Sequence, residues 1–303
     1  MKKTFYSNGK LLITGEYLVL DGAKALALPT KYGQNLIVEK SNNQEIKWTS
    51  YDADGSIWFD ETIPFTAIVS SAPLETESIK NTLITILRSA HQLNPDKLLV
   101  SEGYIITTEL GFPRKWGLGT SSTLINNIAQ WFQIDAFTLL KNSFGGSGYD
   151  IACAQNNTPI LYHLEVEKPI VEIVKFNPSF SQNLYFVYLN QKQSSKSAIA
   201  SYKEKKNNLE TQKEAINQIT QKVLDAENKD VFAQTLEKHE KILSSILATK
   251  TVKETLFPDF NGTIKSLGAW GGDFVLVVSE ENPKSYFLDK GYETVIPYTD
   301  MIL

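Results

Sequence analysis

The chain has 303 residues, which is long enough for one large domain or two ordinary ones. Hydrophobic residues make up 42% and charged residues 21%, a balance typical of a soluble globular protein with a substantial core. The formal net charge of −4 gives no global reason to expect nucleic acid as a partner. No apolar run approaches the roughly 20 residues that a membrane-spanning helix needs, so a membrane is not expected either.

Cysteine usage and the N-terminus bear on location. Cys153 is the single cysteine, so an intramolecular disulfide is excluded and a reducing compartment is favoured. The first ten residues carry lysines but lack the apolar core of a signal peptide. The sequence therefore predicts a cytoplasmic protein.

Short β-rich runs dominate the first sixty residues. A turn at Asp21-Gly22 separates two groups of them. We expect strands over the following runs: 10–20 with an interruption at Gly15 and Glu16, 25–28 closed by Pro29, 36–39, 46–49 and 57–59.

Helical and strand-like patterns alternate in the rest of the chain, and we see a boundary near residues 165–180. Helices are predicted over 78–92, over 124–132, near 136–142, and over 202–250, where two amphipathic helices break near Asn228. Strands are predicted over 98–109, 183–190, 274–279 and 293–297. Both halves thus mix strands and helices.

The segment 114–123 reads R-K-W-G-L-G-T-S-S-T, and a helical apolar pattern follows at once. Glycines before a helix let the backbone wrap around a ligand, and the first helical turn offers unpaired N–H groups and a positive dipole end. Thr120, Ser121 and Ser122 stand where they can cap the helix, contact phosphate or bind Mg²⁺. The segment indicates a nucleotide triphosphate site, with an ordinary capped helix as the alternative.

Familiar phosphate-binding patterns do not fit this segment. No lysine precedes the hydroxyls, so the segment is not the loop of P-loop proteins. The chain also lacks a G-x-G-x-x-G after a strand and the motifs of protein kinases.

Two further glycine clusters stand at 144–150, F-G-G-S-G-Y-D, and at 265–274, K-S-L-G-A-W-G-G-D-F. Asp150 is either a helix N-cap or a rigidly held carboxylate available as a base or metal ligand. Lys10, before a strand, is either a solvated terminus or a partner of Asp150 or of phosphate. The third cluster is either a plain turn or a place where two backbones approach a phosphate.

The order of these motifs resembles the GHMP kinases, the family of galactokinase and of homoserine, mevalonate and phosphomevalonate kinases. The first family motif is similar to G-K-L-L-I-T-G-E-Y-L-V-L-D-G (9–22) and the second to G-L-G-T-S-S-T (117–123). The third is similar to S-L-G-A-W-G-G-D-F (266–274), and G-S-G-Y-D-I-A (146–152) resembles the segment with the catalytic aspartate.

The resemblance implies a two-domain α+β fold with a cleft that holds the phosphate loop. The first domain, 1–170, would bind ATP and resemble a ribosomal-protein-like domain with a left-handed βαβ crossover. The second, 171–303, would be ferredoxin-like. Whether the protein is a monomer or a homodimer stays open.

The same resemblance implies roles for individual residues. Lys10 would lie close to Asp150 and the transferring phosphoryl group, and Asp150 would accept or orient the proton of the acceptor. Ser121 would contribute to binding Mg²⁺. The ATP phosphates would lie on Gly117, Leu118, Gly119, Thr120, Ser121 and Ser122.

The acceptor implied by the resemblance is a small molecule, and G-E-Y at 15–17 favours phosphomevalonate over mevalonate. Glu16 is either part of the substrate site or a buried structural acid. Lys192, Lys196 and Ser197 would bind the acceptor phosphate, although the residues by themselves favour a plain polar loop after a strand. The acceptor pocket would be shaped by Gly268, Ala269, Gly271 and Gly272.

Two departures from the family pattern keep other functions open. Trp270 stands where the family usually has glycine, so we expect a bulkier third loop and an altered pocket. The region 139–142 offers no glutamate as a second Mg²⁺ ligand. These departures favour, as an alternative, a non-catalytic homologue that binds a small molecule or a partner. Mevalonate kinase is the rival within the family, and the related ATP-dependent decarboxylase of diphosphomevalonate is a third possibility.

Overall fold

The computed structural model describes residues 2–74, 78–98, 102–191, 195–205 and 209–303. It divides into two compact units, each built from three stretches of the chain. Unit 1 comprises Met1–Gly9, Tyr32–Arg114 and Leu118–Gln155, and unit 2 comprises Lys10–Lys31, Lys115–Gly117 and Asn156–Leu303. Strands β1 (Lys2–Leu12) and β2 (Ala25–Ser41) contribute residues to both. The two compact units do not test the predicted boundary near residue 170 between an ATP-binding domain and a second domain, so this boundary stays a prediction.

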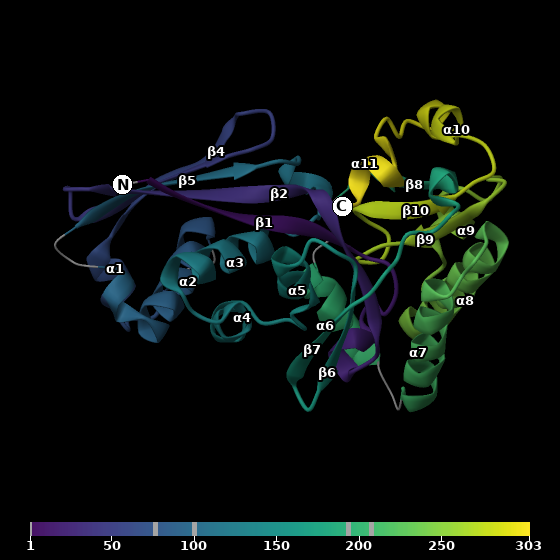
Figure 1. Ribbon diagram of the computed structural model, residues 1–303, viewed down its shortest axis with the longest axis horizontal. Helices are drawn as coiled ribbons and strands as arrows, with labels where there is room; N and C mark the ends of the chain where they lie inside the picture. Colours follow the sequence, from purple (N-terminus) through teal and green to yellow (C-terminus); the bar gives the residue numbers. More distant parts are fainter. Residues whose placement is uncertain (1, 75–77, 99–101, 192–194, 206–208) are drawn as a thin grey trace. The chain divides into compact units, whose positions relative to one another are not determined.

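Unit 1 is a sheet covered by helices. Its strands follow the order β4 (Ile57–Pro64), β3 (Glu45–Tyr51), β5 (Gly103–Leu110) and β2, and β1 pairs with β2. The β3–β5 pair is parallel, and β2 runs antiparallel to β5. One face of the sheet is covered by helices (Figure 1): α1 (Phe65–Val69), α2 (Ile79–Leu93), α3 (Thr120–Phe132) and α4 (Ala136–Ser143). Helix α5 (Tyr149–Gln155) packs against α3.

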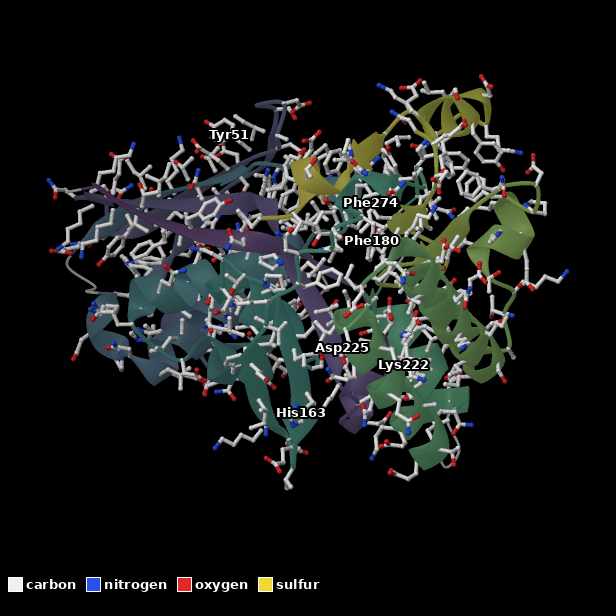
Figure 2. The ribbon with its side chains drawn as sticks, turned by 45° about the vertical axis from the view of Figure 1, so that its right-hand side comes forward. Tyr51, His163, Phe180, Lys222, Asp225 and Phe274 are labelled. Carbon is white, nitrogen blue, oxygen red and sulfur yellow. The ribbon has the colours of Figure 1, made fainter. Side chains whose placement is uncertain are left out.

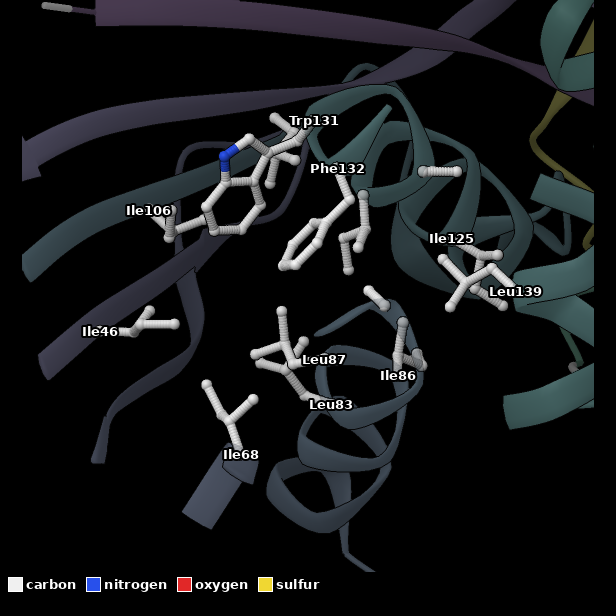
Figure 3. Close-up of a cluster of buried hydrophobic side chains, with 14 of the residues drawn as sticks. Ile46, Ile68, Leu83, Ile86, Leu87, Ile106, Ile125, Trp131, Phe132 and Leu139 are labelled. Atoms are coloured by element: carbon white, nitrogen blue, oxygen red, sulfur yellow. The ribbon is translucent and has the colours of Figure 1, made fainter. Parts of the chain in front are cut away.

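The core of unit 1 forms where the apolar faces of these helices meet the sheet (Figure 3). Leu83 and Leu87, one turn apart on α2, point into the cluster that also contains Ile106 of β5 and Phe132 of α3. Full burial of each such side chain contributes about 1.5–3 kcal/mol. Ser78 caps α2 by accepting a hydrogen bond from the Asn81 amide, so the predicted helix over 78–92 is confirmed.

Unit 2 contains an antiparallel four-stranded sheet in the order β11 (Val295–Pro297), β8 (Leu184–Tyr188), β10 (Phe274–Val278) and β9 (Thr263–Ser266). Helices lie between β8 and β9 and between β10 and β11, which is the βαββαβ order of a ferredoxin-like domain. In chain order they are α6 (Ser195–Lys205), α7 (Glu210–Leu224), α8 (Lys229–Leu247), α9 (Val252–Leu256) and α10 (Lys284–Asp289), and α11 (Tyr298–Met301) follows β11. Helices α7 and α8 lie side by side, and α8 packs on β9 (Figure 1).

A hairpin completes unit 2. Strand β6 (Ile160–Glu165) pairs with β7 (Lys168–Ile173) and with the first residues of β2. Within the described ranges, no helix is long and apolar enough to cross a membrane.

Two sequence predictions about elements were wrong, and a third was incomplete. The second half of the expected strand 10–20 is a short 3-10 helix (Leu18–Asp21), because Gly15 and Tyr17 have positive φ angles that turn the chain. Pro29 does not close a strand: it lies inside β2, between the residues paired with β6 and those paired with β5, where its missing N–H breaks neither ladder. The expected helix pair in 202–250 is α7 and α8, and a further helix, α6, precedes them.

Candidate functional site

The glycine turn at 117–119 leads directly into α3. Gly117 and Gly119 have φ angles of 69° and 103°, which side chains rarely tolerate. A Cβ on Gly117 would also lie 2.3 Å from Oδ2 of Asp273. Position 117 is therefore restricted to glycine twice over, by its backbone and by its neighbour.

The first turn of α3 has the form of an anion site. Its N-cap residue is Gly119, and in the part of the chain that the structure describes no side chain caps this helix. The buried Ser122 hydroxyl donates to the Gly119 carbonyl at 2.9 Å, whereas the Ser121 side chain is exposed. The hydroxyls thus do not cap the helix, and its first amides stay available to a ligand.

Lys10 lies beside this turn. Its Nζ donates to the carbonyl oxygen of Gly117 at 2.9 Å, although the two residues are 107 positions apart. Lys10, Gly117, Gly268 and Asp273 line a small cavity in unit 2, with apolar walls from Leu11, Leu12, Trp116, Leu267 and Phe274. A cation and a carboxylate therefore lie at the predicted phosphate loop, and Asp273 is a site residue that sequence reasoning missed.

The third glycine loop is fixed to the end of β8. The Asp273 amide donates to the Gln191 carbonyl at 2.9 Å, and the Leu189 amide donates to the Asp273 carbonyl at 2.8 Å. Gly268 and Gly271 have left-handed backbones, and Phe274, at the start of β10, continues the chain into the sheet (Figure 2). Asp273 itself has a φ of 52°, so its carboxylate is held by a constrained backbone.

Trp270 does not line this cavity, and the expected effect of its bulk on the acceptor pocket stays a prediction. Its indole packs against the cluster formed by Tyr17, Tyr202 and Leu247. The Trp270 amide donates to the Tyr17 hydroxyl at 2.9 Å, and the indole Nε1 donates to the Lys250 carbonyl at 3.2 Å. Local sequence could not show where the indole points.

Glu16 belongs to a buried charged cluster. Its Oε1 lies 2.5 Å from Nζ of Lys265, a side chain without solvent exposure. Burial raises the pKa of the Glu16 carboxyl, and the attraction of Lys265 opposes that rise. This position fits the structural alternative for Glu16; contact with a substrate stays a prediction.

Helix α8 supplies the rest of this cluster. His239 Nε2 accepts the Gly15 amide at 3.0 Å, and burial and Lys265 lower the pKa of its imidazole, so His239 is neutral. Glu240 Oε1 lies 3.5 Å from Lys265 Nζ, and the Ser266 hydroxyl donates to its Oε2 at 3.1 Å. The cluster joins the first motif to β9, the strand before the third loop.

Asp150 lies in the first turn of α5 in unit 1, after a turn in which Gly145, Gly146 and Gly148 have left-handed backbones. Its half-buried carboxylate accepts a hydrogen bond from the Ile151 amide at 3.1 Å. Gln155 at the end of α5 donates to the buried Asn126 of α3 at 3.0 Å. Unit 1 therefore contains both the helix with Asp150 and the helix with Ser121.

The structure describes the side chains of only some of the residues predicted to bind the acceptor. Lys192 lies outside the described residues, and Lys196 is in α6, where its side chain is not described. Ser197 is exposed in the first turn of the same helix. Ala269 and Gly272 are buried in the third loop.

No protein-family model matches the chain, and no curated protein matches its sequence. The structure is similar to mevalonate kinase of Methanococcus jannaschii over 97% of this chain and 96% of that one, with 17% identity and a TM-score of 0.70.

Two more solved structures show the same likeness. Streptococcus pneumoniae phosphomevalonate kinase in complex with phosphomevalonate and AMPPNP has a TM-score of 0.69 and 17% identity, over 97% of this chain and 99% of that one. Lactococcus lactis galactokinase complexed with galactose has a TM-score of 0.64 and 12% identity, over 95% and 88% of the two chains.

Proposed function

We propose that this chain, which has the fold of the GHMP kinases, transfers the terminal phosphoryl group of ATP to phosphomevalonate. The observation that carries the proposal is the hydrogen bond from Lys10 Nζ to the Gly117 carbonyl. Among the described residues, no side chain caps the helix that follows this glycine turn in the sequence. A cation at a glycine turn and the uncapped start of a helix both suit a polyphosphate. The single cysteine favours a cytoplasmic setting for this reaction.

The nucleotide would bind through Gly117, Leu118, Gly119 and the first turn of α3. Backbone amides and the positive helix end would neutralise the phosphates. Mg²⁺ in nucleotide sites usually takes one or two protein ligands besides the phosphates and water. The exposed Ser121 hydroxyl suits that part, whereas Ser122 is engaged with Gly119. Bound Mg²⁺ would neutralise charge on the phosphates.

Two residues would act on the transferring group. The acceptor oxygen would attack the terminal phosphorus while its proton passes to Asp150, and the bond from phosphorus to the bridging oxygen would break to release ADP. Lys10 would place positive charge beside the moving phosphoryl group. Phosphoryl transfer needs such positioning and charge more than covalent chemistry.

For the acceptor, we propose Lys192, Lys196 and Ser197 as ligands of its phosphate, and the third loop, Gly268, Ala269, Gly271 and Gly272, as its wall. Ser197 is exposed in the first turn of α6, where a helix dipole favours an anion. Glu16 would hold the first motif in place through its buried contact with Lys265, rather than contact the acceptor. Mevalonate is the second candidate, favoured by the likeness to mevalonate kinase.

An assay of ADP release separates these readings. The purified protein is given ATP and Mg²⁺ with phosphomevalonate, mevalonate, homoserine or galactose in turn. Release with phosphomevalonate alone supports the proposal, and turnover on mevalonate alone overturns the choice of acceptor. Carbon dioxide release from diphosphomevalonate would identify a decarboxylase.

The catalytic role of Asp150 has its own test. The Asp150→Asn variant should lose activity by orders of magnitude and still bind ATP, because the amide keeps the shape of the side chain but cannot accept the proton. Unchanged turnover would reject the role. ATP binding by the unaltered protein without transfer to any acceptor would favour a non-catalytic homologue.

A further inference from the structure

We infer that Trp270 is a positioning residue: it fixes the third glycine loop to helix α6 and so sets the affinity for the acceptor. The inference rests on the proposed function, because α6 begins at the predicted acceptor residues. Every contact that carries it lies within unit 2.

The third glycine loop is attached to its surroundings in unit 2 through Trp270. Trp270 is the one large side chain among residues 268–272, and two of the neighbouring glycines have left-handed backbones. Both N–H groups of Trp270 donate outside the loop, to the Tyr17 hydroxyl at 2.9 Å and to the Lys250 carbonyl at 3.2 Å. The indole therefore restrains a glycine-rich segment that has high backbone freedom of its own.

A buried cluster of side chains links Trp270 to helix α6. Tyr17, Tyr202 and Leu247 form a buried cluster on which the indole packs, together with Ala198 of α6. The rings of Tyr17 and Tyr202 lie 5.4 Å apart. Tyr202 is a fully buried residue of α6, and its hydroxyl donates to the Asp21 carboxylate at 2.6 Å. Helix α6 is thus anchored through its middle.

Tyr17, whose hydroxyl accepts the hydrogen bond from the Trp270 amide, has a strained backbone. Its φ of 64° and ψ of −51° lie outside the regions that side-chain-bearing residues prefer. Such strain persists only where the surroundings over-determine it. The hydrogen bond from the Trp270 amide to the Tyr17 hydroxyl and the tilted ring contact with Tyr202 supply those surroundings, so the first motif, the third loop and α6 are held in one arrangement.

This arrangement explains why a bulky residue stands in the loop. Ser197 is five residues, about one and a half turns, before Tyr202 on α6, and Gly268 to Gly272 are the proposed wall of the acceptor pocket. A fixed distance between them orders the pocket before the acceptor binds, which lowers the entropy lost on binding. Trp270 therefore acts on the acceptor through α6 and the loop, not by touching it.

The experiment compares Trp270→Gly with Trp270→Phe. We expect Trp270→Gly to raise the KM for the acceptor about tenfold, with the KM for ATP within about twofold. Amides of α6 should exchange hydrogen at least about tenfold faster than in the unaltered protein. Trp270→Phe keeps a ring in the cluster and should restore most of both values.

Val252→Ala is the matched control, because it removes buried apolar surface from a different cluster of unit 2. It should lower stability without changing α6 exchange or the KM for the acceptor. An acceptor KM that is unchanged in Trp270→Gly, or that changes together with the KM for ATP, overturns the inference. If the unaltered protein transfers phosphate to no acceptor, the proposed function fails; α6 exchange then decides, and unchanged exchange in Trp270→Gly overturns the anchoring role.

Discussion

The buried cluster around Lys265 gives a sharp prediction for stability against pH. Glu240 is 3% exposed, and burial together with the negative charge of Glu16 raises the pKa of its carboxyl from 4.5 to about 7, against the attraction of Lys265. The change is Glu240→Gln. Glutamine keeps the shape and can still accept the Ser266 hydroxyl, but it does not ionise.

The size of the pH effect on the free energy of unfolding follows from the difference between the folded and the unfolded pKa of Glu240. Because the folded pKa of Glu240 is raised, the unfolded chain ionises this group near pH 4.5, while the folded protein keeps it protonated until about pH 7. The free energy of unfolding should therefore fall as the pH rises through this window and stay level above it. At about 1.4 kcal/mol per pKa unit, the contribution lost is about 3 kcal/mol.

The assay is urea unfolding of the unaltered protein and of Glu240→Gln at several values between pH 4 and pH 8. Glu16 and His239 also face Lys265, so the quantity of interest is the difference between the two proteins at each pH. That difference should shift in favour of the glutamine variant by about 3 kcal/mol from pH 4 to pH 8. A difference that stays constant within about 0.5 kcal/mol would refute the assignment of the titration to Glu240.

Other predictions concern the glycine turn and its neighbours. Lys10→Met should lower kcat by about 100-fold or more in steady-state assays at nearly unchanged melting temperature, because the half-buried cation beside the Gly117 carbonyl is lost; a KM effect alone would contradict its role in transfer. Gly117→Ala should weaken nucleotide binding in a titration, since its Cβ would overlap the Asp273 carboxylate; adding Asp273→Ala should recover part of the loss, and no recovery would mean that backbone strain dominates. Lys265→Met should destabilise the fold by about 3–5 kcal/mol in urea, because Glu16 loses its buried cation; a loss below about 1 kcal/mol would show that Glu16 is protonated in the folded protein.

Local features of the chain were predictable, whereas contacts between distant segments were not. The glycine turn at 117–119 and α3 were predicted because glycine positions and apolar periodicity are written in neighbouring residues. The ferredoxin-like order of unit 2 came from the resemblance to a family and is confirmed by the strand order. Helix α6 was missed because its serines and lysines give a weak apolar face.

The partners in the candidate site could not be read from spacing. His239 meets Gly15 across 224 positions, and Lys265 meets Glu16 across 249. No local pattern distinguishes a lysine that will be fully buried from one on a solvated face. Likewise, the left-handed backbone of Tyr17 depends on tertiary contacts that neighbouring residues do not specify.

The interleaving of the two units affects how the chain folds while it is being synthesised. Residues 25–27 pair antiparallel with residues 160–162, so this ladder forms only after more than a hundred further residues are made. At about 5–20 residues per second, that interval is roughly 7–27 s. Neither unit can be obtained by cutting the chain once, since each takes three separate stretches. Nascent polypeptide of this kind offers a chaperone the first residues of β2 before β6 is made.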